Sequence, residues 1–297
     1  MQQTVILDGI KTADSYRADI AGTLLSLGKR GVTPGLAVVL VGENPASASY
    51  VKAKQKACEE VGIRTFDFTF PATISEIELL DLVEKLNADP LVHGILVQLP
   101  LPSHVSEQKV IETINPEKDV DGFHPLNVGR MMLGQDCFLS CTPYGIIKML
   151  EFWGIQTQGK HVVVCGRSAI VGKPVANMLL QKGAFADATV TICHSKTKNL
   201  SYYTEQADIL IAAMGQPRLI RASMIKEGAV VIDVGVNRIP DPSKKSGFSL
   251  TGDVAFDECI GKASHITPVP RGVGPMTITM LLSNTALSAV RSLQRAK

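Results

Sequence analysis

Short runs of apolar, β-branched residues alternate with helix-sized segments along this chain, and this alternation constrains the fold more than any other feature. The clearest runs are Leu36–Val41, His93–Val97, His161–Cys165, Ala188–Cys193, Asp208–Ala213 and Ala229–Val234. Runs that are apolar throughout are typical of parallel strands, which are buried on both faces. A length of 297 residues is enough for two domains. The sequence therefore predicts an α/β protein of two domains.

The charge balance excludes several classes of partner. Thirty Lys and Arg residues face 28 Asp and Glu residues, for a net charge of +2, and aromatic residues make up only 5%. Such a chain has neither the basic surface nor the stacking platform of a nucleic-acid-binding protein. It also shows no continuous apolar run of about 18 residues and no basic-then-apolar N-terminal segment, so we expect no membrane partner.

The six cysteines form no C-x-x-C pair and no zinc-type spacing with histidine, so we predict no metal site. Most of them precede or lie within apolar stretches and are expected to be buried free thiols. This cysteine usage favours a reducing compartment, and we expect a cytoplasmic protein.

A glycine-containing segment follows the run His161–Cys165 and leads into a predicted helix with Pro174 near its start. Gly166 and Gly172 are spaced G-x5-G, and a strand–glycine turn–helix of this kind lets backbone N–H groups approach a pyrophosphate. The alternative is a strand–helix turn that merely needs glycine. Gly215, at the end of a later strand, is a second place where backbone can lie against a dinucleotide.

The next strand favours NADP over NAD. A Rossmann fold that binds NAD carries an acidic residue about 20 residues further on, for the ribose 2′-hydroxyl. Here that strand ends in His194-Ser195-Lys196-Thr197, without a carboxylate. Together with Arg167 and Ser168 these groups suit a 2′-phosphate. A solvated strand end is the alternative interpretation of His194 and Lys196.

Residues 45–62 predict a helix whose apolar face contains one charged residue, Lys54, one turn after Tyr50. Such a lysine either extends to solvent, is buried with a carboxylate, or loses its proton readily and takes part in chemistry. Two further polar groups stand out. Gln98 ends a buried strand beside prolines, and Asp121 lies on a predicted turn; a strand cap and a turn residue are their ordinary roles.

Seven motifs together resemble the bifunctional methylenetetrahydrofolate dehydrogenase/cyclohydrolase family, in order and over nearly the whole chain. They are Tyr50-x-x-x-Lys54, Val97-Gln98-Leu-Pro-Leu-Pro, Lys118-Asp-Val-Asp121-Gly122, Cys141-Thr-Pro-x-Gly145, Gly166-Arg-Ser-x-x-Val-Gly172-x-Pro174, Cys193-His-Ser-Lys-Thr197 and Pro268-Val-Pro-x-Gly272-Val-Gly-Pro-Met-Thr277.

The resemblance implies a homodimer with a folate-binding catalytic α/β domain, residues 1–140 plus 276–297, and a Rossmann-type NADP-binding domain, residues 141–275, around a cleft. It implies oxidation of 5,10-methylenetetrahydrofolate by NADP to the 5,10-methenyl form, and hydrolysis of that product to 10-formyltetrahydrofolate. Tetrahydrofolate derivatives would be its substrates, in the one-carbon metabolism that supplies purine biosynthesis.

The resemblance also implies roles for individual residues. The catalytic group would be Lys54, Tyr50, Gln98 and Asp121, with Gln98 orienting Lys54. The NADP-binding residues would be Gly166, Arg167, Ser168, Gly172, Pro174, His194, Ser195, Gly215 and Val236. The folate-binding residues would be Tyr50, Asp121, Pro270, Gly274 and Pro275.

One position departs from the family pattern: Arg271 stands where the family usually has glycine. If the backbone there needs a positive φ, arginine introduces strain; if the position lies near folate, its charge could meet the glutamate tail. Two other functions remain open at this stage. One is a shikimate-type or amino-acid dehydrogenase that uses NADP, and the other is a non-catalytic nucleotide sensor.

Overall fold

The computed structural model describes residues 3–244 and 247–295, and the chain separates into two compact units. Unit 1 comprises Met1–Ala13 and Thr142–Thr277, and unit 2 comprises Asp14–Cys141 and Ile278–Lys297. Two of the divisions fall inside the helices α1 (Gly9–Gly28) and α10 (Val273–Arg295). Both units contain a parallel sheet and helices, which confirms the predicted two-domain α/β class.

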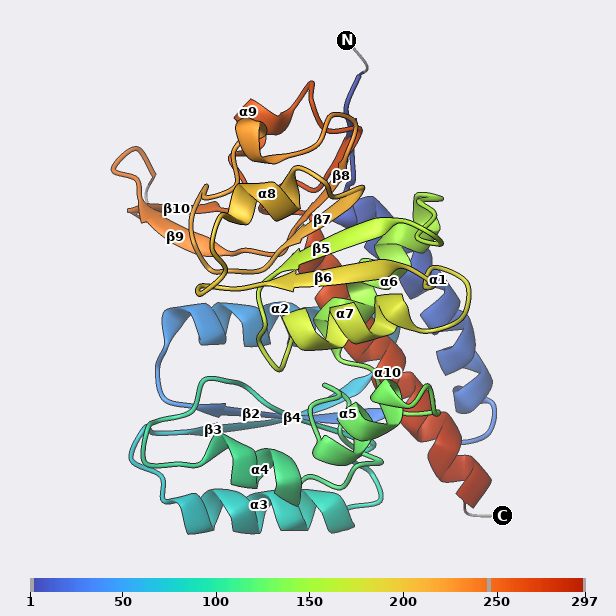
Figure 1. The fold of residues 1–297 in the computed structure, drawn as a ribbon. Coiled ribbons are helices and arrows are strands. Elements are labelled where there is room, and N and C mark those ends of the chain that lie inside the picture. Colours follow the sequence, from blue (N-terminus) through green and yellow to red (C-terminus); the bar gives the residue numbers. More distant parts are fainter. Residues whose placement is uncertain (1–2, 245–246, 296–297) are drawn as a thin grey trace. The chain divides into compact units, whose positions relative to one another are not determined.

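Unit 1 is built on a six-stranded sheet in which every neighbouring pair is parallel, in the order β1-β11-β8-β7-β5-β6. Its strands are β1 (Val5–Ile6), β5 (His161–Cys165), β6 (Thr189–Cys193), β7 (Ile209–Ala212), β8 (Val230–Asp233) and β11 (His265–Ile266). Its helices are α6 (Cys141–Phe152, whose first residue belongs to unit 2), α7 (Gly172–Leu180), α8 (Leu200–Thr204) and α9 (Phe256–Cys259), with a 3-10 turn at Ala222–Met224. Figure 1 shows α7 and α8 on opposite sides of these strands.

The strand order defines where this sheet can bind a ligand. The chain runs from β5 through α7 to β6 at one edge, then returns to the other side of β5 for β7, β8 and β11. The direction of winding therefore reverses between β5 and β7. Doubly wound sheets bind dinucleotides at such a reversal, outside the carboxyl ends of the strands. The five strands β6-β5-β7-β8-β11 follow the Rossmann order without its outermost strand, and β1 adds a sixth strand at the opposite edge.

A two-stranded antiparallel hairpin extends from unit 1 after β8. It consists of β9 (Asn237–Pro240) and β10 (Phe248–Thr251). The segment between them is exposed at Pro242–Lys244 and at Gly247, and residues 245–246 lie outside the described residues.

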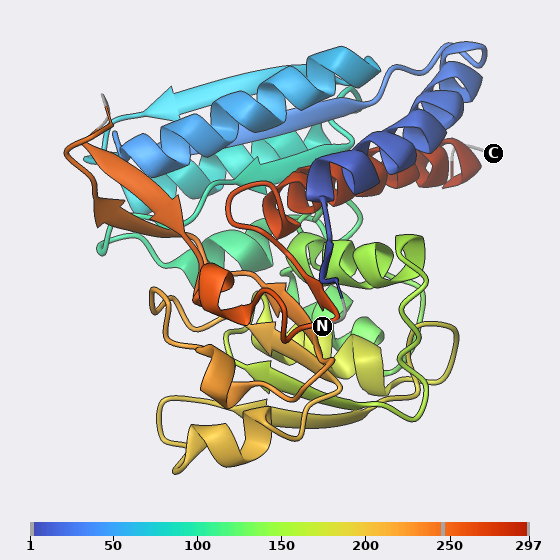
Figure 2. The same ribbon diagram turned by 90° about the horizontal axis from the view of Figure 1, so that it is seen from above.

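Unit 2 has a three-stranded parallel sheet in the order β3-β2-β4. Its strands are β2 (Gly35–Val41), β3 (Arg64–Phe70) and β4 (Gly94–Val97), and its remaining helices are α2 (Pro45–Val61), α3 (Glu76–Ala88), α4 (Glu107–Thr113) and α5 (Pro125–Met132). Figure 2 shows α2 lying lengthwise over β2 and β3. A buried core of Val, Leu and Ile side chains fills the space between the sheet and the helices α3 and α4.

All six predicted strands are present, as β2 and β4 to β8, and each end lies within one residue of its expected position. The strand β3 was missed because its sequence, RTFDFTF, alternates polar and apolar residues at the sheet edge. The first strand also differs from expectation. Residues 1–140 were assigned to one domain, whereas β1 pairs with β11 in the sheet of unit 1.

Helix α10 is long and apolar enough to cross a membrane by length and composition, although polar residues interrupt its apolar sequence. Its polar residues show that it is a core helix. Asn284 donates to the carbonyls of Val120 (2.8 Å) and Leu139 (2.9 Å), and Ser288 donates to that of His93 (2.6 Å). These bonds fix the unit 2 part of the helix against its loops.

The cysteines are as predicted. All six thiols are free and buried.

Candidate active site and nucleotide site

Lys54 lies inside unit 2 rather than at its surface. The side chain comes from α2, and the residue is only 5% exposed, so it does not extend to bulk solvent. Its Nζ donates to Oε1 of Gln98 at 3.1 Å and lies 5.4 Å from the centroid of the Tyr50 ring. The buried amine is therefore held by a neutral amide and an aromatic face.

Gln98 is oriented for this contact by its own backbone surroundings. It follows β4 directly, and its backbone N–H donates to Val39 at 2.9 Å. Its Nε2 donates to the carbonyl of Leu99 at 2.8 Å, which leaves Oε1 as the atom facing the lysine. The strand end thus presents an acceptor to Lys54.

The two carboxylates of the Lys118–Gly122 segment have different roles. Asp119 is buried and accepts from the N–H groups of Phe123 (3.2 Å) and His124 (2.9 Å) and from Nδ2 of Asn127 (2.8 Å). It holds the loop in shape. Burial raises the pKa of Asp119, and these donors partly offset that effect.

Asp121 keeps part of its surface exposed and belongs to the lysine's surroundings. Burial raises the pKa of Asp121, and the positive charge of Lys54 acts in the opposite direction. A small cavity beside it is lined by apolar side chains that include Val97, Leu99 and Phe123. The structure therefore brings Tyr50, Lys54, Gln98 and Asp121 together in unit 2, as the sequence analysis expected.

The glycine turn of unit 1 is required by close backbone approaches. A Cβ on Gly166, whose φ is +135°, would lie 2.2 Å from the carbonyl oxygen of Ala213 at the end of β7. A Cβ on Gly172 would lie 2.2 Å from the carbonyl oxygen of Gly166. The G-x5-G spacing thus lets the first turn of α7 rest directly on the end of β5.

Ser168 holds the turn that leads into that helix. Its Oγ accepts from the N–H groups of Val171 (3.1 Å) and Gly172 (3.3 Å). Pro174 is buried in the first turn of α7.

A cavity of about 570 Å³ opens at the carboxyl ends of β5, β6 and β7. Five of the predicted nucleotide residues line it, namely Gly166, Arg167, Ser168, His194 and Ser195. The loop after β6 is held by the Thr197 hydroxyl, which accepts from the N–H of His194 at 2.9 Å. Exposed basic and hydroxyl groups, a glycine cradle and this position at the winding reversal fit a dinucleotide with a 2′-phosphate.

Other predicted residues lie outside the lining of this cavity. Gly215 has a φ of +64° and follows β7, whereas Val236 is 61% exposed after β8. Pro270, Gly274 and Pro275 lie in unit 1, in and beyond the loop that precedes α10. The cavity lining also includes Met214 and Gln216, the neighbours of the Gly215 that the sequence analysis singled out after this strand.

The structure shows a positive φ at Arg271, so arginine introduces backbone strain at this position. Arg271 has a φ of +81°, and its carbonyl accepts from the N–H of Gly9 at 2.8 Å. Its guanidinium lies 3.3 Å from a carboxylate oxygen of Asp8. The position thus needs the conformation that glycine adopts most easily.

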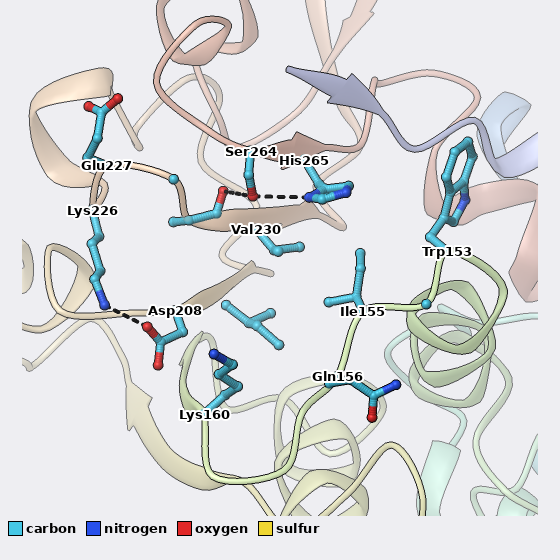
Figure 3. A pocket seen from close by; sticks show the side chains of 14 residues that line it. Trp153, Ile155, Gln156, Lys160, Asp208, Lys226, Glu227, Val230, Ser264 and His265 are labelled. Atoms are coloured by element: carbon cyan, nitrogen blue, oxygen red, sulfur yellow. Dashed lines mark hydrogen bonds and ion pairs between the residues drawn. The ribbon is translucent and has the colours of Figure 1, made fainter. Parts of the chain in front are cut away.

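A second cavity, of about 360 Å³, lies at the amino ends of β7, β8 and β11 of the same sheet (Figure 3). Two of its charged groups pair with each other: Lys226 donates to Asp208 at 2.6 Å and thereby lowers the pKa of that carboxyl. None of the residues predicted from the sequence lines it. Within residues 3–244 and 247–295, no three His, Cys, Asp or Glu side chains are grouped to hold a metal ion.

The comparisons with known proteins cover both units. Residues 7–121 match the model of the tetrahydrofolate dehydrogenase/cyclohydrolase catalytic domain, and residues 140–293 match that of its NAD(P)-binding domain. The chain is 60% identical to the bifunctional protein FolD of Geobacillus thermodenitrificans, over 97% of this chain and 98% of that protein.

Two solved structures show the same architecture. The bifunctional FolD enzyme of Campylobacter jejuni is 49% identical, with a TM-score of 0.91 over 97% of this chain and 99% of that one. The Trypanosoma brucei enzyme, solved with NADP and an inhibitor, is 39% identical, with a TM-score of 0.94 over 99% of this chain and 100% of that one.

The doubly wound sheet, the glycine turn and the buried lysine define a dinucleotide-dependent α/β enzyme. The chain belongs to the tetrahydrofolate dehydrogenase/cyclohydrolase family.

Proposed function

We propose that this chain is a bifunctional enzyme that uses NADP to oxidise 5,10-methylenetetrahydrofolate and then hydrolyses the 5,10-methenyl product to 10-formyltetrahydrofolate. The observation that carries the hydrolytic half is the buried amine of Lys54, 5% exposed and bonded to Gln98. Because the chain belongs to this family, we prefer this function to a shikimate-type dehydrogenase and to a non-catalytic nucleotide sensor.

The oxidation needs positioning more than acid–base chemistry. The reacting carbon lies between two nitrogens, so loss of a hydride leaves a cation that these nitrogens stabilise, and no proton is removed. NADP, when bound, supplies the hydride acceptor. Gly166 and Gly172 would hold its pyrophosphate, and Arg167, Ser168, His194 and Ser195 would hold its 2′-phosphate side. Pro174, Gly215 and Val236 are assigned to the nucleotide by the family resemblance.

The hydrolysis does require a proton acceptor. Water attacks the methenyl carbon and loses one proton, which the Lys54 amine can accept, or the amine can orient the water. The bond from the carbon to N5 then breaks, and the hydroxyl proton passes to N5 to leave the 10-formyl group. The bond from Lys54 to Gln98 fixes the direction of one Nζ hydrogen.

Folate binding is assigned to both units. Tyr50 would pack on the substrate, and Asp121 would accept paired hydrogen bonds from the pterin, a geometry that a carboxylate matches. Pro270, Gly274 and Pro275 would contribute from unit 1. These roles follow from the family resemblance and from the grouping of Tyr50 and Asp121 around Lys54.

The decisive experiment measures NADPH formation and methenyl hydrolysis separately in Lys54→Met. We expect cyclohydrolase activity to be abolished while part of the hydride transfer survives. Lys56→Met is the matched control, because Lys56 lies on the same helix with a side chain 77% exposed, and it should retain both activities. Undiminished hydrolysis in Lys54→Met would exclude the lysine as the proton acceptor.

Asp121→Ala should weaken folate binding and so reduce both activities. Folate affinity equal to that of the wild type would refute the role given to Asp121. We also propose, from the family resemblance, that the chain forms a homodimer, and, from its cysteine usage, that it is cytoplasmic. Light scattering on the purified protein should give twice the chain mass, and the mass of a single chain would contradict the homodimer.

A further inference from the structure

Asp253 is a buried carboxylate that the functions above leave unused. It lies two residues after β10 and has no exposed surface. Its Oδ2 accepts from the N–H groups of Met214 (2.5 Å) and Gly215 (2.9 Å). Its Oδ1 accepts from the N–H of Gln216 and from Nδ2 of Asn237, both at 2.9 Å. Three consecutive backbone N–H groups thus converge on one carboxylate, as in an anion-binding nest.

A second buried carboxylate fixes Asp253 itself. Asp233, at the end of β8, accepts from the N–H groups of Asp253 (2.9 Å), Val254 (2.9 Å) and Gly235 (3.0 Å). Its own N–H donates to the hydroxyl of Thr267, after β11, at 2.7 Å. The two carboxylates therefore connect the segments that follow β7, β8 and β11.

The backbone closes tightly around both groups. A Cβ on Gly235 would lie 2.3 Å from Oδ1 of Asp253, and a Cβ on Gly252 would lie 1.8 Å from Oδ2 of Asp233. Neither carboxylate can move without displacing main chain. The loop 214–216 is thus held by a carboxylate that is itself enclosed by main chain.

That loop borders the nucleotide cavity. Met214 and Gln216 line it together with Arg167, His194 and Ser195. The loop 214–216 therefore borders the same cavity as the groups proposed to hold the 2′-phosphate, at the winding reversal where doubly wound sheets bind dinucleotides.

We propose that Asp253 is a positioning residue, whose carboxylate shapes the loop 214–216 to receive NADP in this cavity. The inference rests on the proposed function and adds a residue that none of the motifs singled out. The proposal predicts that changing Asp253 affects the two activities differently, because hydride transfer needs the nucleotide and hydrolysis of the methenyl substrate does not.

The informative variant is Asp253→Asn, which keeps the shape and removes one acceptor. All four partners of the carboxylate are donors, and an amide can accept only at its single oxygen, so donors face the new NH2 group whichever way it points. We expect the dissociation constant for NADP, measured by calorimetric titration, to rise at least tenfold. Dehydrogenase KM for NADP should rise in parallel, and cyclohydrolase activity should stay within twofold of the wild type.

Two further variants complete the test. Asp257→Asn is the matched control, with a side chain 79% exposed, and should bind NADP as the wild type does. Asn237→Ala removes one of the four donors and should weaken NADP binding severalfold, so it decides the question if Asp253→Asn does not fold.

The outcomes are distinguishable. Unaltered NADP affinity in both Asp253→Asn and Asn237→Ala overturns this inference and leaves the proposed function intact. Equal loss of both activities in folded Asp253→Asn also overturns it, because a general structural role would affect hydrolysis too. Absence of NADP binding by the wild-type chain would overturn the proposed function and this inference with it.

Discussion

Replacing Gly172 by alanine tests the glycine turn directly. The added methyl carbon would lie 2.2 Å from the carbonyl oxygen of Gly166, 2.6 Å from its carbonyl carbon and 2.9 Å from the backbone nitrogen of Arg167. All three are main-chain atoms and cannot rotate away. Restoring an ordinary contact of about 3.4 Å moves α7 and the turn apart by roughly 1.2 Å, and overpacking of this kind costs about 1–3 kcal/mol of unfolding free energy.

The functional effect should exceed the loss of stability. The turn's N–H groups are the proposed pyrophosphate site, and a misplacement of about 1 Å in a binding constellation can cost on the order of 100-fold. We therefore expect NADP affinity to fall at least tenfold in calorimetric titration. The cyclohydrolase activity, for which the proposed proton acceptor is Lys54 of unit 2, should be retained.

A glycine-to-alanine substitution within a helix should stabilise the protein instead of destabilising it. Gly22 lies within α1, and a Cβ there would meet no heavy atom within 4 Å. Gly22→Ala should raise the free energy of unfolding by about 0.5–1 kcal/mol, because alanine favours a helix over glycine. If Gly172→Ala bound NADP as tightly as the wild type, the turn would be only a strand–helix connection and the reasoning would fail.

Two further predictions concern titratable groups. Burial raises the pKa of the Cys58 and Cys165 thiols to about 12, so a thiol reagent at pH 8 should react with them only after denaturation; rapid modification of the native protein would contradict this. Burial, reinforced by the neighbouring Asp253, raises the pKa of Asp233 to about 6. The folded chain then binds a proton that the unfolded chain releases near pH 4. The contribution of Asp233 to stability is thus fully present below about pH 4 and falls by about 3 kcal/mol as pH rises to about 6. Carboxyl ¹³C NMR titration should give the raised pKa, and an ordinary value near 4 would refute it.

The buried lysine illustrates what sequence patterns can specify. Periodicity placed Lys54 on the apolar face of its helix, and the structure confirms that it is buried. Its partner Gln98 was recognisable as a polar residue ending an apolar strand. The pairing of the two was supplied by the family resemblance, because the 44 residues that separate them carry no local signal of contact.

The two carboxylates after Lys118 mark the limit of such reasoning. The sequence places Asp119 and Asp121 on the same predicted turn and does not distinguish their roles. Only the folded loop shows that Asp119 accepts hydrogen bonds from Phe123, His124 and Asn127. The other carboxylate, Asp121, lies beside the lysine. The same applies to Arg271, whose positive φ follows from its bond to Gly9 in a distant segment.

The α/β class, the six strands, the glycine turn and the preference for NADP were predictable from the sequence, because each depends on short-range periodicity or on neighbouring residues; of these strands only β6, at the sheet edge, is largely exposed or half-buried. The tertiary structure alone decided that β1 joins the sheet of unit 1 and that Asp253 receives the loop after β7. Those contacts join residues far apart in the chain. They exist because buried backbone N–H groups must find acceptors, and the packing of the sheet determines which acceptor lies within reach.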